Sequence, residues 1–181
     1  MTRLTDKVSD ASVRERTGRG WDEWFALLDG EGPAARDHTA IARWLVDVQG
    51  LDNWSAQTVT VGYEQARGLR APGQDRDGTY TTNTTKTIGV PVGRVFAAFT
   101  DARLRQRWLP QRVAVRSATA DKYFRADWGD GTRIDVGFVA KGSGRTQVAV
   151  AHQRIVSAEV AAEVRADWTE RLLALKKLLE G

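Results

Sequence analysis

The chain of 181 residues is long enough for one medium domain or two small ones, and its 41% hydrophobic and 28% charged residues are ordinary for a globular protein. It contains no cysteine, which excludes disulfides, thiolate nucleophiles and cysteine-bound zinc. No apolar run approaches the roughly 20 residues of a membrane span, and no apolar signal-peptide core follows Met1. We therefore expect a cytoplasmic protein that does not contact membranes.

The formal net charge of +4 is unevenly distributed, with −3 on residues 1–78 and +7 on residues 79–181. A basic half could attract an acidic ligand or nucleic acid. The basic residues are scattered, however, and the nearest approach to a cluster is Arg103, Arg105, Arg107 and Arg112. Aromatic residues fall in apolar stripes rather than between basic residues, so we expect a solvated basic surface and no nucleic-acid partner.

Residues 1–70 are predicted to form a helical module. Three segments carry apolar residues at helical spacing: Trp21, Trp24, Phe25 and Leu28; Ile41, Trp44, Leu45 and Val48; and Trp54, Val59, Tyr63 and Ala66. Glycine follows each segment, with Gly30 and the Gly32–Pro33 pair after the first, and a short leading helix is expected around Ser9 to Thr17. The four tryptophans of these segments are expected to form the core of the module.

Residues 71–79 lack apolar periodicity and are rich in turn-forming residues, which indicates a linker. From residue 80 onward the period changes to the alternation of strands. Strands are predicted at Tyr80–Val90, around Val113 and Val115, at Phe124–Trp128, at Ile134–Ala140 and around Val148–His152. Asp130–Gly131 predicts a tight hairpin between the third and fourth of these strands.

Helical patterns interrupt and end this series of strands. Pro91 opens a helix that carries Val92, Val95, Phe96 and Phe99, and Asp101 caps a second short helix that reaches Trp108 and Leu109. Ser157 caps a long final helix whose apolar stripe consists of Val160, Val164, Trp168, Leu172, Leu175 and Leu179. An antiparallel sheet with one apolar face must cover that face, and the long helix is its natural cover. We therefore predict an α+β fold in residues 80–181, a helix-grip sheet wrapped on the long C-terminal helix, after an all-α module.

This order of motifs resembles the START/SRPBCC superfamily, close to the branch named after activators of the heat-shock ATPase. The resemblance rests on PVGRVFAAFTDA at 91–102 with Trp108, DGTRIDVGF at 130–138, QVAVAHQ at 147–153 and WTERLLALKKLL at 168–179. Residues 17–28, 38–45 and 61–64 are similar to a small helical module of unknown function that is common in actinobacteria. The resemblance implies a helix-grip fold that holds a small hydrophobic or aromatic molecule.

A ligand would lie between the sheet and the long helix, so aromatic and polar side chains facing that space are the candidate binding residues. They are Phe96, Phe99, Trp108, Phe124, Trp128, Phe138, His152 and Trp168. For most of these aromatic residues we favour plain core packing over a role in binding.

His152 shares a strand face with Val148 and Val150, which places it inward as a general base, a ligand-orienting group or a structural histidine with one hydrogen bond. We favour the structural interpretation, because no triad or metal-ligand spacing surrounds it. His38 is expected at the surface or as a helix cap. Asp127 and Asp135 are expected on the exposed face, and Asp130 is explained by its turn. The sequence thus predicts no catalytic residue, no metal and no cofactor, although it does not settle whether the protein is an enzyme.

The leading hypothesis is a ligand-binding protein. Some relatives protect actinobacterial hosts from enediyne antibiotics by binding the drug and being cleaved by its radical, and Gly137, Gly142 and Gly144 are the candidate cleavage sites here. Gly137, within a strand, is also explained by a bulge. The alternatives are a polyketide cyclase or aromatase-like enzyme and a module that binds a chaperone ATPase. The oligomeric state stays open.

Overall fold

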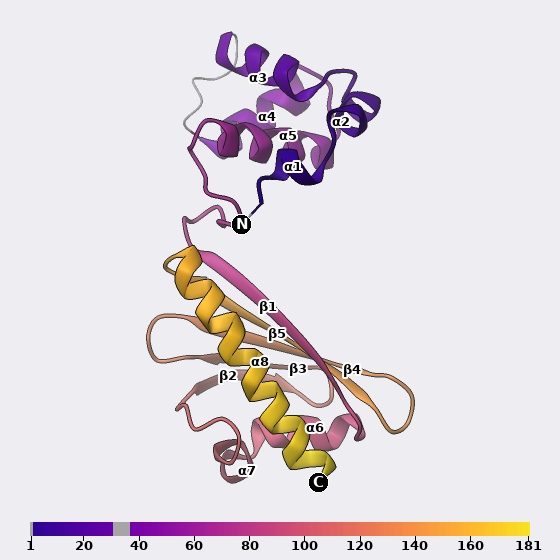
Figure 1. The fold of residues 1–181 in the computed structure, drawn as a ribbon, viewed down its shortest axis with the longest axis vertical. Helices are drawn as coiled ribbons and strands as arrows, with labels where there is room; N and C mark the ends of the chain where they lie inside the picture. Colours follow the sequence, from indigo (N-terminus) through magenta and orange to yellow (C-terminus); the bar gives the residue numbers. More distant parts are fainter. Residues whose placement is uncertain (1, 31–36) are drawn as a thin grey trace. The chain divides into compact units, whose positions relative to one another are not determined.

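The computed structural model describes residues 2–30 and 37–181, which form two units, residues 1–78 and residues 79–181 (Figure 1). The predicted helix end at Gly32 and Pro33 lies outside the described residues. Within the described ranges, no helix is long and apolar enough to cross a membrane.

The N-terminal unit is helical over its described residues. Its helices are α1 (Leu4–Lys7), α2 (Asp10–Thr17), α3 (Trp21–Gly30), α4 (His38–Asp47) and α5 (Asn53–Ala66). Side chains directly before three of them accept hydrogen bonds from the first turn, namely Ser9, Asp37 and Asp52. The α5 segment is helical although Val59, Thr60 and Val61 are β-branched or strand-favouring residues. Helical spacing places Val59 and Tyr63 together in the core. The predicted helix over this segment is confirmed.

The core of this unit departs from the prediction at one tryptophan. Trp21 and Trp24 are buried, and Trp44 is packed against them as a partly buried residue. Trp54, by contrast, is 58% exposed, and the Arg16 guanidinium lies 4.4 Å from the centre of its ring. The prediction that Trp54 belongs to the core was therefore wrong, because its position in the first turn of α5 directs it away from the packed face.

The C-terminal unit is a five-stranded antiparallel sheet with three helices. Its elements are β1 (Tyr80–Ile88), α6 (Val92–Thr100), α7 (Ala102–Gln106), β2 (Ala114–Thr119), β3 (Tyr123–Asp127), β4 (Arg133–Ala140), β5 (Thr146–Ile155) and α8 (Ala158–Glu180). The strand order is β1-β5-β4-β3-β2, so the first strand pairs with the last. This arrangement confirms the predicted α+β helix-grip fold.

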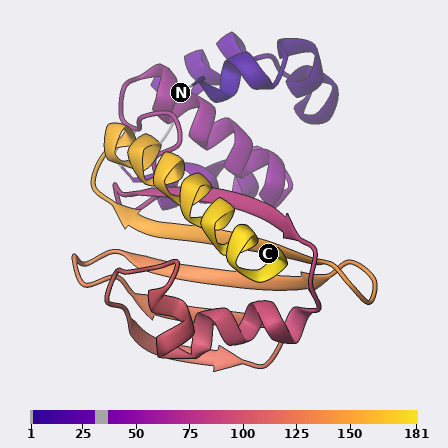
Figure 2. The same cartoon turned by 60° about the horizontal axis from the view of Figure 1, so that its bottom comes forward.

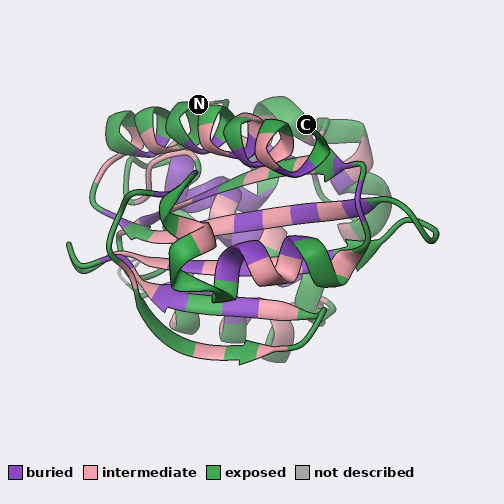
Figure 3. Cartoon of the chain, turned by 90° about the horizontal axis from the view of Figure 1, so that it is seen from below, coloured by how far each residue is buried: buried purple, intermediate pink, exposed green. Residues whose placement is uncertain are grey.

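Residue alternation gives the sheet one apolar face, which we call the inner face, and one polar outer face. Along β4, for example, Ile134, Val136 and Phe138 are buried, while Asp135 and Gly137 between them are half-buried. The helices α6, α7 and α8 lie on the inner face, where their apolar residues join those of the strands in one core (Figures 2 and 3). That core is the space in which the sequence placed a ligand.

The capping predictions for this unit largely agree with the structure. Ser157 accepts a hydrogen bond from the Val160 amide at the start of α8, and Asp101 accepts two at the start of α7. Two details differ. The helix α7 ends at Gln106, before Trp108, and Val160 is 38% exposed while Ala161 is buried in its place. The apolar stripe of α8 is thus shifted by one residue in its first turn.

Candidate functional site

All eight predicted binding residues lie together in the interior of the C-terminal unit. They form two groups of rings: Phe96, Phe99, Trp108, Phe124 and Phe138 in one, and Trp128, His152 and Trp168 in the other. Phe96 is partly buried, and every other member is at most 8% exposed. The structure therefore brings the eight side chains into one interior, and their role in binding stays a prediction.

The phenylalanine group is centred on Phe99 of α6. Its ring centroid lies 4.7 Å from that of Trp108, 5.2 Å from Phe138 and 5.7 Å from Phe124, with tilted or edge-to-face geometry. Such pairs contribute about 0.5–1.5 kcal/mol beyond area burial. The Trp108 indole is fixed further by donating to the backbone oxygen of Ala98 at 3.0 Å. The rings thus form a continuous aromatic wall beneath α6.

The second group surrounds His152, which is 2% exposed. The indole N–H of Trp168 donates to His152 Nδ1 at 2.9 Å, so Nδ1 carries no proton. The other nitrogen, Nε2, then carries the proton and donates to Thr132 Oγ1 at 2.7 Å. Both nitrogens of a neutral imidazole therefore have hydrogen-bond partners. This supports the structural interpretation of His152, with two hydrogen bonds where the sequence predicted one.

The chain of hydrogen bonds continues outward to the β3–β4 turn. Thr132 donates its hydroxyl to Asp130 Oδ1 at 2.6 Å and its amide at 2.8 Å, which confirms that the turn explains Asp130. The Asp130 carboxylate therefore ends a polar chain that begins at the buried indole of Trp168. We call this chain of Trp168, His152, Thr132 and Asp130 the histidine chain.

Burial and hydrogen bonding set the ionisation of both titratable groups in the histidine chain. Burial lowers the pKa of His152, and the carboxylates of Asp130 and Asp167, which raise it, do not offset that effect. Burial also raises the pKa of Asp130, but the hydrogen bonds from Thr132 outweigh it, so this pKa lies below its usual range. A neutral imidazole and an ionised carboxylate are the forms that the fold favours.

The outer face carries the carboxylates that the sequence assigned to it. Asp127 accepts from Arg133 at 2.9 Å and Asp135 lies 3.6 Å from Arg125, and both carboxylates are more than a third exposed. In the described ranges no group of three or more His, Cys, Asp or Glu side chains could hold a metal ion.

The candidate cleavage glycines do not share one environment. Gly137 pairs in regular register with Tyr123 on β3 and Ala149 on β5, so the expected bulge at this position is wrong. Its missing side chain would point to the outer face, together with Asp135, and away from the aromatic interior. Gly142 and Gly144 lie in the exposed β4–β5 turn, where Gly142 has φ +81°.

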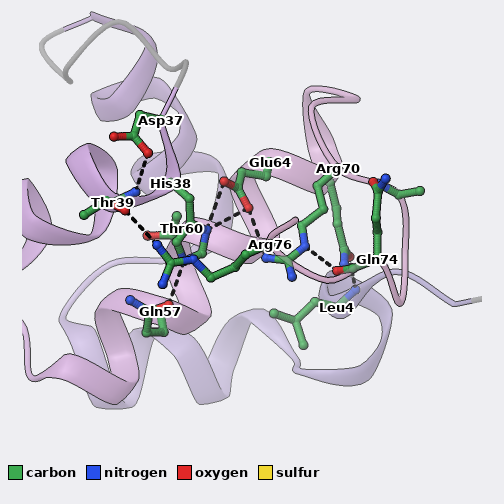
Figure 4. A network of polar contacts seen from close by, with 12 residues as sticks. Leu4, Asp37, His38, Thr39, Gln57, Thr60, Glu64, Arg70, Gln74 and Arg76 are labelled. Atoms are coloured by element: carbon green, nitrogen blue, oxygen red, sulfur yellow. Dashed lines mark hydrogen bonds and ion pairs between the residues drawn. The ribbon is translucent and has the colours of Figure 1, made fainter. Parts of the chain in front are cut away.

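The polar cluster that sequence reasoning missed lies in the N-terminal unit (Figure 4). His38, expected as a cap or at the surface, has a side chain only 11% exposed, while Asp37 caps α4. Its Nδ1 lies 3.0 Å from both carboxylate oxygens of Glu64, and Arg70 lies 3.4 Å from the same carboxylate. The Glu64 carboxylate is 9% exposed and lies between the Arg70 guanidinium and the His38 imidazole, so it has the partners that a buried charge requires.

A signal for this cluster was present in the sequence. Gln57, Thr60 and Glu64 recur at i, i+3 and i+7 along α5, which places three polar side chains on one helix face. The prediction for this helix rested on its apolar stripe alone. Two of the polar residues, Thr60 and Glu64, are buried.

Comparisons with known proteins agree on the fold. A conserved protein of unknown function from Enterococcus faecalis matches with a TM-score of 0.51 at 14% identity, over 64% of this chain and 80% of that one. The AHSA1-like protein of Rhizobium etli gives 0.48 at 19% identity, over 57% and 83%. The Aha1 dimer of Colwellia psychrerythraea gives 0.49 at 17% identity, over 55% and 96%.

These likenesses concern the fold alone, because all three identities are below 25%. No family model matches the chain, and no curated protein matches it. The chain therefore shares its fold with the Enterococcus faecalis protein, and its activity has to be argued from its own residues.

Proposed function

We propose that the C-terminal unit binds a small apolar or aromatic molecule on the inner face of its sheet, along the seam between α8 and the α6–α7 pair. The observation that carries the proposal is a set of partly buried apolar side chains that pack against the aromatic core from these helices: Val92, Phe96, Leu104, Val164 and Leu178. Apolar side chains left partly in water beside an aromatic wall form a surface that an apolar ligand covers favourably.

Access to the core would come from α7. This helix has five residues and none of them is buried, whereas α6 and α8 each bury several residues. Elements with few buried contacts open at the lowest free energy. Displacement of α7 with Leu104 would expose the face of the phenylalanine group while the sheet and α8 stay in place.

The geometry favours binding over catalysis at this site. Both nitrogens of His152 are engaged, one by an indole donor and one by a hydroxyl acceptor, and burial lowers the pKa of the ring. A general base needs a nitrogen that faces the substrate. Neither the cyclase-like nor the chaperone-binding alternative has a supporting contact among the described residues.

The finer form of the proposal is self-resistance to an enediyne antibiotic, in which the activated drug takes a hydrogen atom from a glycine Cα and the backbone breaks there. Exposure favours Gly142 and Gly144 over Gly137, which is only partly exposed and faces away from the proposed ligand. Mass spectrometry after activation of the drug in the presence of the protein tests this form. Fragments ending near residues 142–144 support it, and an intact chain rejects it while leaving reversible binding to be judged separately.

Binding itself is tested by titrating the full chain with fatty acids, aromatic polyketides and an enediyne, with tryptophan fluorescence as the readout. Trp108, Trp128 and Trp168 lie in the proposed binding unit, so a bound ligand is expected to quench part of the emission in a saturable way. The variant Leu104→Glu places a charge in the seam and is expected to abolish the response. The matched control Val139→Glu places the same charge at a position that is 51% exposed on the outer face, and should retain it.

Equal responses from the two variants would place any binding elsewhere and contradict the proposal. No saturable response from any class, with the protein folded, would contradict it as well.

A further inference from the structure

The N-terminal unit holds two adjoining hollows whose shared wall is made by His38 and Arg76. The larger hollow, about 260 Å³, lies between α4 and α5, and the smaller, about 130 Å³, lies between His38 and the segment that follows α5. Every residue that lines them belongs to residues 1–78. The larger hollow is slightly below the usual range for drug-sized ligands, so it fits a metabolite of small size.

The polar lining of the larger hollow is dominated by hydrogen-bond donors at one end. Thr39 and Arg43 are four residues apart and lie on the same side of α4. Arg76 donates to Thr39 Oγ1 at 2.7 Å (Figure 4). The hollow is therefore lined by two arginines, Arg43 and Arg76, and each guanidinium has five N–H donors in a planar fork.

The buried charge behind this wall is already balanced. Glu64 faces His38 and Arg70, so its carboxylate has partners without Arg43 or Arg76 of the larger hollow. The outward nitrogen of His38, Nε2, lies 2.7 Å from Gln57 Oε1 at the edge of the larger hollow. Both ring nitrogens of His38 therefore lie within hydrogen-bond distance of a side-chain oxygen.

The floor and the far end of the hollow have a different character. Ala42 and Val46 of α4 form an apolar floor, and Asp47 lies one helical turn beyond Arg43. An anion near Asp47 would be repelled, whereas one near Arg76 would be attracted. The charge of the lining therefore differs between the two ends of the hollow, with the positive end at Thr39 and Arg76 and the negative end at Asp47.

We propose that this hollow binds a small molecule through an oxyanion, a carboxylate or a phosphate group. Arg76 and Arg43 donate to the oxyanion, Thr39 lies between them, and the short body of the ligand lies over Ala42 and Val46. Guanidinium groups are the side chains best matched to carboxylate and phosphate, because they form paired charge-assisted hydrogen bonds. This site is separate from the helix-grip interior and does not depend on the function proposed for it.

The chain offers an unusually clean measurement, because it contains only two histidines, His38 at the hollow and His152 in the other unit. The imidazole signals of the full chain are recorded by NMR at constant pH and ionic strength during titration with inorganic phosphate, phenyl phosphate or benzoate. Sodium chloride serves as the reference for a general salt effect. We expect a saturable shift of the His38 signals and no shift of the His152 signals.

Variants separate binding from a purely structural role of the cluster. Arg76→Gln keeps Glu64 and both of its partners, so the unit should stay folded while the dissociation constant rises about tenfold or more. Arg19→Gln removes the same charge from an exposed position outside the hollows, and should leave the constant unchanged. Stronger binding of phenyl phosphate than of benzoate identifies a phosphate ligand, and the reverse order identifies a carboxylate.

Three outcomes would overturn the proposal: a chloride titration that moves the His38 signals as far as the anions do, no saturable shift with any of the anions, or an unchanged dissociation constant in Arg76→Gln. A loss of binding in Arg19→Gln equal to that in Arg76→Gln would also overturn it, because net charge rather than the hollow would then account for the effect.

Discussion

The histidine chain makes the stability of the C-terminal unit depend on pH in a predictable direction. His152 is neutral in the fold, with Nδ1 accepting from the Trp168 indole and Nε2 donating to Thr132. Protonation at Nδ1 would place two donors against each other in a buried site. Burial lowers the pKa of His152 in the folded chain below its ordinary value of about 6.5.

The sign follows from the protons bound by each state. Below about pH 6.5 the unfolded chain binds a proton at residue 152 that the folded chain does not bind, so the free energy of unfolding falls as the pH falls. The stabilisation is fully present above about pH 6.5 and is lost as the pH falls from there through the folded pKa. Between the two pKa values the slope approaches about 1.4 kcal/mol per pH unit.

The variant His152→Gln isolates this effect. A glutamine amide can still accept from the Trp168 indole and donate toward Thr132, but it does not titrate. We expect the variant to be less stable than the wild type at pH 7.5, because the planar ring also packs edge-on against Trp128 at 5.0 Å. That difference should narrow as the pH is lowered to 5, since only the wild type loses the contribution of the neutral imidazole.

The assay combines two measurements on the full chain. Denaturant unfolding at several pH values gives the stability difference, with amide exchange along β5 reporting the C-terminal unit alone, and NMR titration of the imidazole gives the folded pKa directly. An ordinary or raised pKa for His152 would refute the reasoning. Parallel pH dependence of the wild type and His152→Gln would refute it equally.

Four further substitutions test packing and buried polar groups. Thr132→Val removes the acceptor of His152 and is expected to destabilise the C-terminal unit by about 1–3 kcal/mol, measured by denaturant unfolding. Glu64→Gln leaves the largely buried Arg70 guanidinium without its counter-charge and should cost about 3–5 kcal/mol, measured by thermal unfolding followed by circular dichroism. Gly137→Ala should be neutral or stabilise by about 0.5–1 kcal/mol, because the added Cβ meets no atom within 4 Å, whereas Gly62→Ala should destabilise, because its Cβ would lie 2.5 Å from an indole carbon.

Matched controls distinguish these effects from general sensitivity to substitution. Thr100→Val removes an exposed hydroxyl that donates to the backbone oxygen of Phe96 in the same helix, and Glu15→Gln removes an exposed carboxylate. Each control is expected within about 0.5 kcal/mol of the wild type. A destabilisation by Gly137→Ala comparable to that by Gly62→Ala would contradict the regular register seen at that strand position.

Much of the C-terminal fold was predictable because its signals are local and periodic. Alternation along the strands and the caps at Asp101 and Ser157 depend on residues a few positions apart, and each was found where the sequence placed it. The regular backbone at Gly137 was not predictable, because a bulge depends on the pairing of three strands. The prediction for Trp54 was wrong because five residues separate it from Val59, which places the two side chains on different sides of α5.

The polar partnerships could not be predicted from spacing, because each joins residues far apart in the chain. His38 meets Glu64 across 26 positions, and His152 meets Thr132 across 20. A sequence can show that a histidine faces inward, but its chemistry depends on which partner each nitrogen meets. One of these histidines lies between an indole and a hydroxyl and is held neutral, whereas the other lies against a carboxylate, with its second nitrogen 2.7 Å from the side-chain oxygen of Gln57. The first histidine therefore completes a core, whereas the second borders an open hollow, where a bound ligand would reach it.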